Sequence, residues 1–179
     1  MSKLELKNGS CIDQKVDAIV NAANRFLISG GGICGAIFKK AGYEELNAAC
    51  RSIKTPLKDG EVAITPAFNI TNAKYIIHAV GPNFRITPNA FNELYKAYYN
   101  SLELLKKNNL HSISFPLISS KIFGYGLQNP AKESTKQCLK AYNRFVELNK
   151  DYDITVILCA YSSQEYGEAK EELYYNQSR

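Results

Sequence analysis

Apolar residues recur along the chain with two different spacings. Short apolar or alternating runs are typical of strands, and polar or glycine-containing turns separate them. These predicted strands cover residues 4–7, 16–23, 61–68, 74–80, 112–118 and 153–161. Between them, apolar residues return at steps of three and four, as on one face of an amphipathic helix. The predicted helices cover residues 33–53, 91–105, 130–148 and 163–175.

Strands that alternate with helices predict an α/β fold, with helices on both faces of a mixed sheet. A chain of 179 residues is of a size for one domain with a full core, and it shows no repeat, low-complexity segment or linker. We therefore expect a single domain over residues 1–179. In such sheets the ligand binds beyond the carboxyl ends of the strands. Residues 21–35, 119–126 and 161–163 follow predicted strand ends, and we expect them to form one cleft.

Three consecutive glycines, Gly30 to Gly32, precede the first predicted helix. A glycine turn that leads into a helix presents free backbone N–H groups, and phosphate is a typical ligand of such a turn. The spacing matches G-x-G-x-x-G, but a dinucleotide fingerprint needs its first glycine close to the strand and an acidic residue at the end of the next strand. Here six residues intervene, the next strand begins only near Glu61, and no G-K-[ST] of a Walker A loop is present. A tight packing turn is the alternative interpretation.

The segment SSKIFGYG, residues 119–126, is a second candidate for phosphate binding. It offers the hydroxyls of Ser119 and Ser120 and the backbone N–H groups between Lys121 and Gly126. Two such loops that face each other would suit a pyrophosphate better than a single phosphate. An ordinary strand-to-helix turn is the alternative.

Two polar side chains lie within or at the end of predicted strands. Asn24 follows a buried strand, and its amide both donates and accepts, which suits a ribose diol. An Asx turn that caps the loop is the alternative. His78 lies inside a strand, several residues before the break at Gly81, and is predicted to be a hydrogen-bonded core residue rather than a catalytic one.

Composition narrows the function classes only slightly. The net charge of +5 suits an anionic partner or simply a soluble surface, and no basic stripe interleaved with aromatic residues predicts nucleic-acid binding. The five cysteines show no paired spacing and predict free thiols in a reducing compartment, the cytoplasm. With two histidines beside them, no zinc site is expected. No apolar run has the length of a membrane span, and neither a membrane anchor nor a leader segment is expected.

Five segments of the chain, in order, resemble the macro domain family and in particular its MacroD-like branch. They are VDAIVNAAN, GGGICGAIFKKAG, GEVAITPAFNI, KYIIHAVGPNF and SISFPLISSKIFGYG, and the resemblance extends from about Leu4 to Leu173. It implies a three-layer α/β/α sandwich that binds ADP-ribose, with neither a cofactor nor a metal. In many relatives it also implies removal of ADP-ribose from proteins, or deacetylation of O-acetyl-ADP-ribose.

The resemblance also implies roles for individual residues. Asn24 would lie on the distal ribose, and the Gly31–Ile33 backbone would hold that ribose and the adjoining phosphate. The Ser119–Phe123 loop would enclose the pyrophosphate with Phe123 over the distal ribose, and Tyr161 would stack on adenine, a contact worth roughly 1–3 kcal/mol. The candidate ligand-binding residues are Ser10, Cys11, Ala22, Asn24, Gly31, Gly32, Ile33, Ser119, Ser120, Lys121, Ile122, Phe123 and Tyr161. The candidate catalytic residues are Asn24, Cys34 and Phe123.

Three positions depart from the family pattern. Ser10 replaces an aspartate that accepts from the adenine amino group, and a hydroxyl would accept a neutral hydrogen bond, roughly half as strong. Cys34 replaces the aspartate assigned to positioning or activating water in hydrolytic MacroD-like relatives. Its place at a helix start should lower the pKa of its thiol, and a small half-buried thiol is the alternative. Lys121 replaces a glycine, and its side chain could reach the phosphates, occupy the distal ribose site or point to solvent.

The sequence therefore predicts a monomer whose partner is ADP-ribose or an ADP-ribosylated protein. In the first hypothesis it is a hydrolase for mono-ADP-ribosyl groups or O-acetyl-ADP-ribose. Water would lie near the distal C1″ between Asn24 and the Gly31–Cys34 loop, and the substrate's own phosphate would do part of the work of the base. In the second it is a non-catalytic reader of ADP-ribose. The missing aspartate and the added Lys121 favour the reader, whereas the otherwise MacroD-like sequence favours the enzyme.

Overall fold

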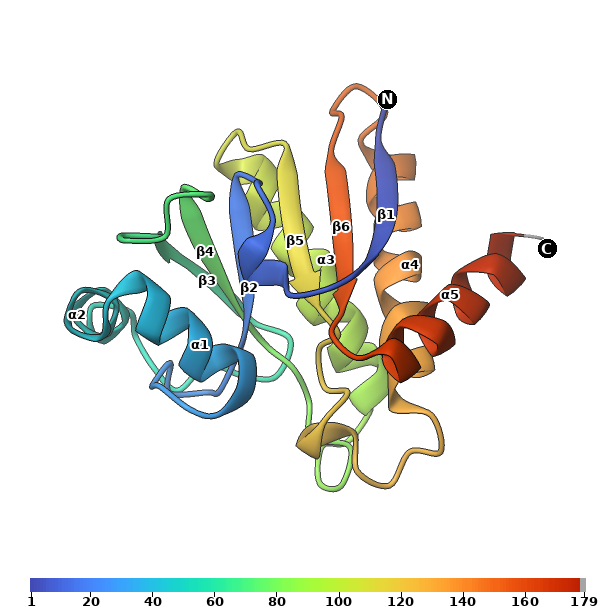
Figure 1. The fold of residues 1–179 in the computed structure, drawn as a ribbon, viewed down its shortest axis with the longest axis horizontal. Helices are drawn as coiled ribbons and strands as arrows, with labels where there is room; N and C mark the ends of the chain where they lie inside the picture. Colours follow the sequence, from blue (N-terminus) through green and yellow to red (C-terminus); the bar gives the residue numbers. More distant parts are fainter. Residues whose placement is uncertain (178–179) are drawn as a thin grey trace.

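A central six-stranded sheet lies between two layers of helices (Figure 1) in the computed structural model, which describes residues 1–177. The strands are β1 (Lys3–Asn8), β2 (Ala18–Ala23), β3 (Val62–Pro66), β4 (Tyr75–Val80), β5 (Ser112–Pro116) and β6 (Thr155–Ala160). The helices are α1 (Gly32–Ala41), α2 (Tyr43–Arg51), α3 (Ala90–Lys107), α4 (Pro130–Leu148) and α5 (Ser163–Gln177). Two short 3₁₀ turns, η1 (Cys11–Asp13) and η2 (Ile122–Gly124), follow β1 and β5. The predicted three-layer α/β/α architecture is confirmed.

The sheet is mixed, with the strand order β1-β6-β5-β2-β4-β3. Neighbouring strands run parallel except β3, which pairs antiparallel with β4 at one edge. The carboxyl ends of β1, β6, β5 and β2 therefore lie along the same edge of the sheet. This is the edge at which open α/β sheets bind their ligands.

Alternate residues of the central strands belong to different layers of the core. In β2, Val20 packs into the cluster beneath α3 and α4, whereas Ile19 packs into the cluster beneath α1 and α2. In β6, Leu158 and Ile157 divide in the same way. Because both faces of the sheet are buried, these strands have continuous apolar sequences instead of the alternation of a half-exposed strand.

The helix predicted over residues 33–53 is wrong as a single element, because it is divided into α1 and α2. α1 ends where the N–H of Gly42 donates to the carbonyl oxygen of Phe38 at 3.0 Å, and α2 begins at Tyr43. The apolar spacing continues across the break, since Phe38 and Leu46 are buried in the same cluster. A pattern of apolar positions alone therefore cannot show that the helix axis changes direction here.

His78 is a core residue, as predicted. Its side chain is fully buried in β4 between the amide of Asn21 and the hydroxyl of Thr65, at 3.0 Å from each. The Asn21 nitrogen donates to Nδ1, so the ring proton is on Nε2 and is donated to Thr65. Burial lowers the pKa of His78 to about 4, so the imidazole is neutral at physiological pH.

We expect this histidine to make the fold sensitive to acid. Unfolded His78 takes up a proton near pH 6.5, whereas the folded residue does so only near pH 4. Its contribution to stability is therefore complete above pH 6.5 and is lost as the pH falls toward 4. Between pH 7 and 5 the free energy of unfolding should fall by about 2 kcal/mol through this residue. Urea denaturation across this range should show that fall in the wild type and in a His111→Gln control, but much less of it in His78→Gln. An equal fall in His78→Gln would contradict the assignment.

All five cysteines are free and buried, which agrees with the prediction of unpaired thiols. Within residues 1–177, each helix is too short or too polar to span a bilayer.

Candidate functional site

A pocket of about 630 Å³ opens at the carboxyl edge of the sheet. This volume is within the usual range for sites that bind small molecules. The segments that follow β1, β2, β5 and β6 line it, and α1 and α5 begin beside it. The three segments expected to form one cleft therefore do so.

All the site residues predicted from the sequence line this pocket. Their roles in ligand binding or catalysis stay predictions. The sequence reasoning missed some further lining residues: Gly9, Ala23, Ala36, Pro116, Leu117, Cys159 and Glu165. Of these, Glu165 is the one that brings a charged group, a carboxylate, to the pocket. The spacing S-x-x-E from Ser162 to Glu165 is typical of a capping box at a helix start and could have indicated it.

The Asn24 side chain organises the first wall of the pocket. Its Oδ1 accepts from the backbone N–H groups of Phe26 and Ile28 at 3.2 and 3.1 Å, and its Nδ2 donates to the carbonyl oxygen of Ile28 at 2.7 Å. These contacts make an Asx turn, the alternative interpretation of this residue. One N–H of the amide is not used by the turn, because Nδ2 carries two hydrogens. The same side chain can therefore hold the loop and donate to a ligand.

The glycine run places the first turn of α1 against the pocket. Gly32 has a left-handed φ of +57°, which favours glycine. A β-carbon at Gly35 would lie 2.5 Å from the carbonyl oxygen of Gly30, so the backbone of the loop can contact α1 only because residue 35 is glycine. The first N–H groups of a helix have no partner within it, and here they belong to lining residues. The result is a helix start at the pocket wall whose free N–H groups could bind an anion as ligand.

The second wall is the loop from Ser119 to Phe123, and contacts at both ends hold it in place. The Ser119 hydroxyl donates to the carbonyl oxygen of Pro82 at 2.7 Å. The N–H of Phe84 donates to the carbonyl oxygen of Phe123 at 2.8 Å. At the end of β5, the buried Tyr98 hydroxyl accepts from the N–H of Ile118 at 3.0 Å. The loop is therefore anchored to α3 and to the segment after β4.

The floor of the pocket is formed by the turn after β1. Ser10 caps η1, and its hydroxyl oxygen accepts from the N–H of Ile12 at 3.3 Å. Its hydroxyl proton is available to donate to a ligand, and its oxygen can accept a second hydrogen bond. Cys11 and Cys159 lie beside it and are buried. This end of the pocket is lined by neutral side chains.

The expectation that the helix start lowers the pKa of the Cys34 thiol is wrong. Burial raises its pKa above the ordinary value, and hydrogen bonds only partly offset this. Cys34 is 5% exposed, and its thiol donates to the carbonyl oxygen of Ile28 at 3.6 Å. A neutral thiol is therefore the dominant form at physiological pH, and the residue is more buried than the small half-buried thiol of the alternative interpretation.

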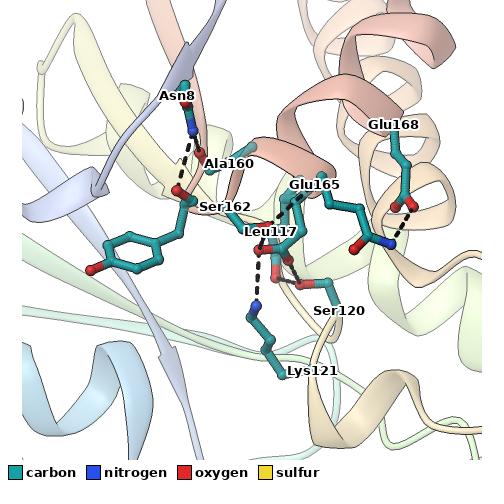
Figure 2. Close-up of polar contacts among 10 residues, drawn as sticks. Asn8, Leu117, Ser120, Lys121, Ala160, Ser162, Glu165 and Glu168 are labelled. Atoms are coloured by element: carbon teal, nitrogen blue, oxygen red, sulfur yellow. Dashed lines mark hydrogen bonds and ion pairs between the residues drawn. The ribbon is translucent and has the colours of Figure 1, made fainter.

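Lys121 and Glu165 are the two charged residues among those that line the pocket within the described chain. Figure 2 shows the Lys121 side chain extending to the Glu165 carboxylate, with Nζ 2.9 Å from Oε1. Lys121 has a φ of −103°, so it does not adopt the left-handed conformation that would favour glycine. None of the three sequence-based alternatives for Lys121 included this ion pair.

Exposed apolar side chains surround the mouth of the pocket. Ile122, Phe123 and Tyr161 are 74%, 38% and 77% exposed. Exposed rings of this kind can stack on a base or cover a sugar. Among residues 1–177, no group of three His, Cys, Asp or Glu side chains is placed to hold a metal ion.

Comparisons with known proteins agree with this architecture. The Macro domain family model matches residues 20–134. The chain is 36% identical over 173 residues to ADP-ribose glycohydrolase MACROD1 of Mus musculus, and the match covers 96% of this chain and 51% of that protein. The chain therefore spans about half the length of this curated relative.

Two solved structures are similar over most of the fold. The macrodomain of Oceanobacillus iheyensis with ADP has a TM-score of 0.88 and 35% identity, covering 99% of this chain and 93% of that one. The Trypanosoma brucei macrodomain in complex with ADP-ribose has a TM-score of 0.83 and 30% identity, covering 95% and 68%.

Proposed function

Because this chain belongs to the macro domain family, we propose that it binds ADP-ribose in the pocket at the carboxyl edge of its sheet. The observation that carries this proposal is that two walls rich in backbone N–H groups, α1 and the Ser119–Phe123 loop, line one pocket. Such walls suit a diphosphate, because N–H groups at a helix start and in a turn stabilise negative charge. The complexes of similar macrodomains with ADP and with ADP-ribose support the same ligand.

In the proposed orientation, the diphosphate lies between α1 and the Ser119–Phe123 loop. The distal ribose lies against Asn24 and the Gly31–Ile33 backbone, with Phe123 over it. Adenine lies near Ser10 and stacks on Tyr161, whose exposed ring is free to receive a base. Ser10 offers adenine a neutral hydrogen bond, and the stacked ring supplies apolar contact that is worth roughly 1–3 kcal/mol.

We further propose that the protein hydrolyses mono-ADP-ribosyl adducts or O-acetyl-ADP-ribose. The name of MACROD1 as an ADP-ribose glycohydrolase supports this class of reaction. In the glycosidic reaction, the oxygen of a water bonds to the distal C1″ while the bond from C1″ to the modified group breaks, and the leaving group keeps the electron pair. The Cys34 thiol is neutral, so a phosphate oxygen of the substrate would accept the proton of the water. Asn24 would orient the distal ribose.

A non-catalytic reader of ADP-ribose is the second candidate. The observation that favours it is that the distal end of the pocket offers an amide and a neutral thiol, Asn24 and Cys34, where a hydrolase would use a carboxylate. A reader and an enzyme would bind the free ligand equally well. The two functions therefore differ only in turnover.

Calorimetric titration and a turnover assay test these proposals together. We expect micromolar binding of ADP-ribose, or about −8 kcal/mol, and release of label from protein that carries labelled mono-ADP-ribosyl groups. Binding without release of label, and without deacetylation of O-acetyl-ADP-ribose, would support the reader. The absence of saturable binding at millimolar ADP-ribose would contradict both functions.

We also propose that residues 1–179 act as one monomeric domain in a reducing compartment, the cytoplasm. Five free cysteines support the choice of compartment, because thiols persist where disulfides are reduced.

A further inference from the structure

The only charged residues that line the pocket, within the part of the chain described, form one ion pair. Lys121 belongs to the Ser119–Phe123 loop, and Glu165 belongs to the first turn of α5. Their contact, 2.9 Å between Nζ and Oε1, therefore joins the Ser119–Phe123 wall of the pocket to the start of α5 (Figure 2). A diphosphate that enters this pocket meets one positive and one negative side chain, and these two groups act on it in opposite directions.

Glu165 has other contacts that hold it in place. The hydroxyl of Ser162 donates to Oε1 at 3.1 Å, and the same oxygen of Ser162 accepts from the N–H of Glu165 at 3.1 Å. The Ser120 hydroxyl oxygen lies 3.5 Å from Oε2, but its one proton is donated to the carbonyl oxygen of Leu117 at 2.8 Å. The carboxylate also lies in the first turn of a helix, where the macrodipole favours negative charge. Its side chain is 14% exposed, so the contacts with Ser162 hold Glu165 in place when Lys121 moves away.

Lys121 is held much more weakly. Its side chain is 69% exposed, and the contact with Glu165 is the one ion pair that it makes within the described chain. A pair whose cation is largely in water contributes little to stability. The ammonium group ends a flexible stem of four carbons and carries three donors. The free-energy cost of moving the Lys121 ammonium group from the Glu165 carboxylate to another anion is therefore small.

We propose that Lys121 is a diphosphate-binding residue that Glu165 holds at the rim of the pocket before the ligand binds. When ADP-ribose binds, Nζ leaves Oε1 and donates to a phosphate oxygen beside the Ser119–Phe123 loop. Glu165 then competes with the ligand for the same ammonium group and makes binding weaker than it would otherwise be. This inference rests on the proposed binding of ADP-ribose.

Two rival interpretations predict different effects of mutation. If the ion pair only joins the loop to α5, substitution of Lys121 and substitution of Glu165 have the same effect on the affinity for ADP-ribose. If Lys121 only blocks the pocket, its shortening or removal strengthens binding. In the exchange that we propose, the two substitutions change the affinity in opposite directions, because Lys121 attracts the ligand and Glu165 competes with it.

The experiment compares Lys121→Met with Glu165→Gln by calorimetric titration with ADP-ribose. Methionine keeps the length of the side chain without its charge, and glutamine keeps the capping box of α5. Lys132→Met is the matched control: it removes the same charge and breaks an ion pair of 2.8 Å to Glu171 of α5, and Lys132 does not line the pocket. Adenosine, titrated by NMR, is the matched ligand without phosphate.

We expect Lys121→Met to weaken ADP-ribose binding about tenfold, the usual effect of losing one charge-assisted hydrogen bond. Glu165→Gln should strengthen it about threefold. Lys132→Met should leave it unchanged, and adenosine should bind all the variants alike. Raising the salt concentration should weaken binding less in Lys121→Met than in the wild type, because one exposed charge no longer contributes.

Loss of affinity in both Lys121→Met and Glu165→Gln would overturn the proposal in favour of a structural link. Stronger binding by Lys121→Met would overturn it in favour of a block. Unchanged affinity in both would show that Lys121 does not contact the ligand. Each of these results requires ADP-ribose to bind the wild type, so they differ from the failure of the proposed function, in which the wild type shows no saturable binding.

Discussion

Replacement of Gly31 by glutamate is expected to weaken ADP-ribose binding about a thousandfold, from the micromolar to the millimolar range, or by about 4 kcal/mol. Gly31 is the N-cap of α1 and lines the pocket, and a β-carbon added there meets no atom within 4 Å. Its φ of −85° is open to any residue, so glutamate causes no backbone strain. The new carboxylate would accept from the N–H groups at the start of α1, where we propose that the ligand phosphate binds.

Gly31→Ala is the matched control for this change. It adds the same β-carbon to the same open space and no charge, so we expect its affinity to stay within about threefold of the wild type. Circular dichroism and thermal unfolding should show that both variants fold. If the glutamate variant bound ADP-ribose as tightly as the alanine variant, α1 would not be the phosphate-binding wall, and the glycine run would serve packing alone.

The location of the pocket could be predicted because it depends on features that are local in sequence. The strands appear as apolar runs, and the loops that line the pocket follow them directly. Gly35 illustrates the limit of this reasoning. The sequence shows that Gly35 lies at the start of a predicted helix. It does not show that the loop folds back, so that the carbonyl oxygen of Gly30 leaves no room for a β-carbon at residue 35.

The chemistry of individual groups was harder to predict because it depends on tertiary packing. A helix start lowers the pKa of a thiol, and burial raises it. At Cys34 burial is the larger effect, since α1 packs this residue against the core beneath it. Sequence position alone indicates the first effect and not the second, so the predicted direction of the shift was wrong.

The ion pair of the pocket shows the same limit. Lys121 and Glu165 are 44 residues apart in the chain. The capping spacing of Ser162 and Glu165 predicts where α5 begins, but it does not show that the helix start lies beside the loop after β5. Parallel strands β5 and β6 are neighbours in the sheet, and this brings the two segments together.

Replacement of Asn24 by alanine is expected to lower the rate of hydrolysis about a hundredfold or more at saturating substrate, and the affinity for ADP-ribose by much less. The proposed reaction needs the distal ribose in one orientation, and a displacement of about 1 Å can cost a factor of about 100 in rate. Alanine removes the free amide N–H and also the three hydrogen bonds of the turn to Phe26 and Ile28. Single-turnover kinetics on mono-ADP-ribosylated protein, with calorimetric titration of the free ligand, would separate the two effects.

Asn24→Ser separates the two functions of this side chain. A serine hydroxyl can still accept from the N–H groups of the turn, but its side chain is shorter and carries a single O–H in place of the amide N–H groups that would reach the ribose. Hydrogen exchange at Phe26 and Ile28 shows whether the turn is kept. If Asn24 acts on the ribose, the serine variant keeps the protection of these N–H groups and loses turnover as the alanine variant does. Recovery of turnover in the serine variant would instead show that Asn24 only shapes the loop, and the water would have to be held by the Gly31–Cys34 backbone alone.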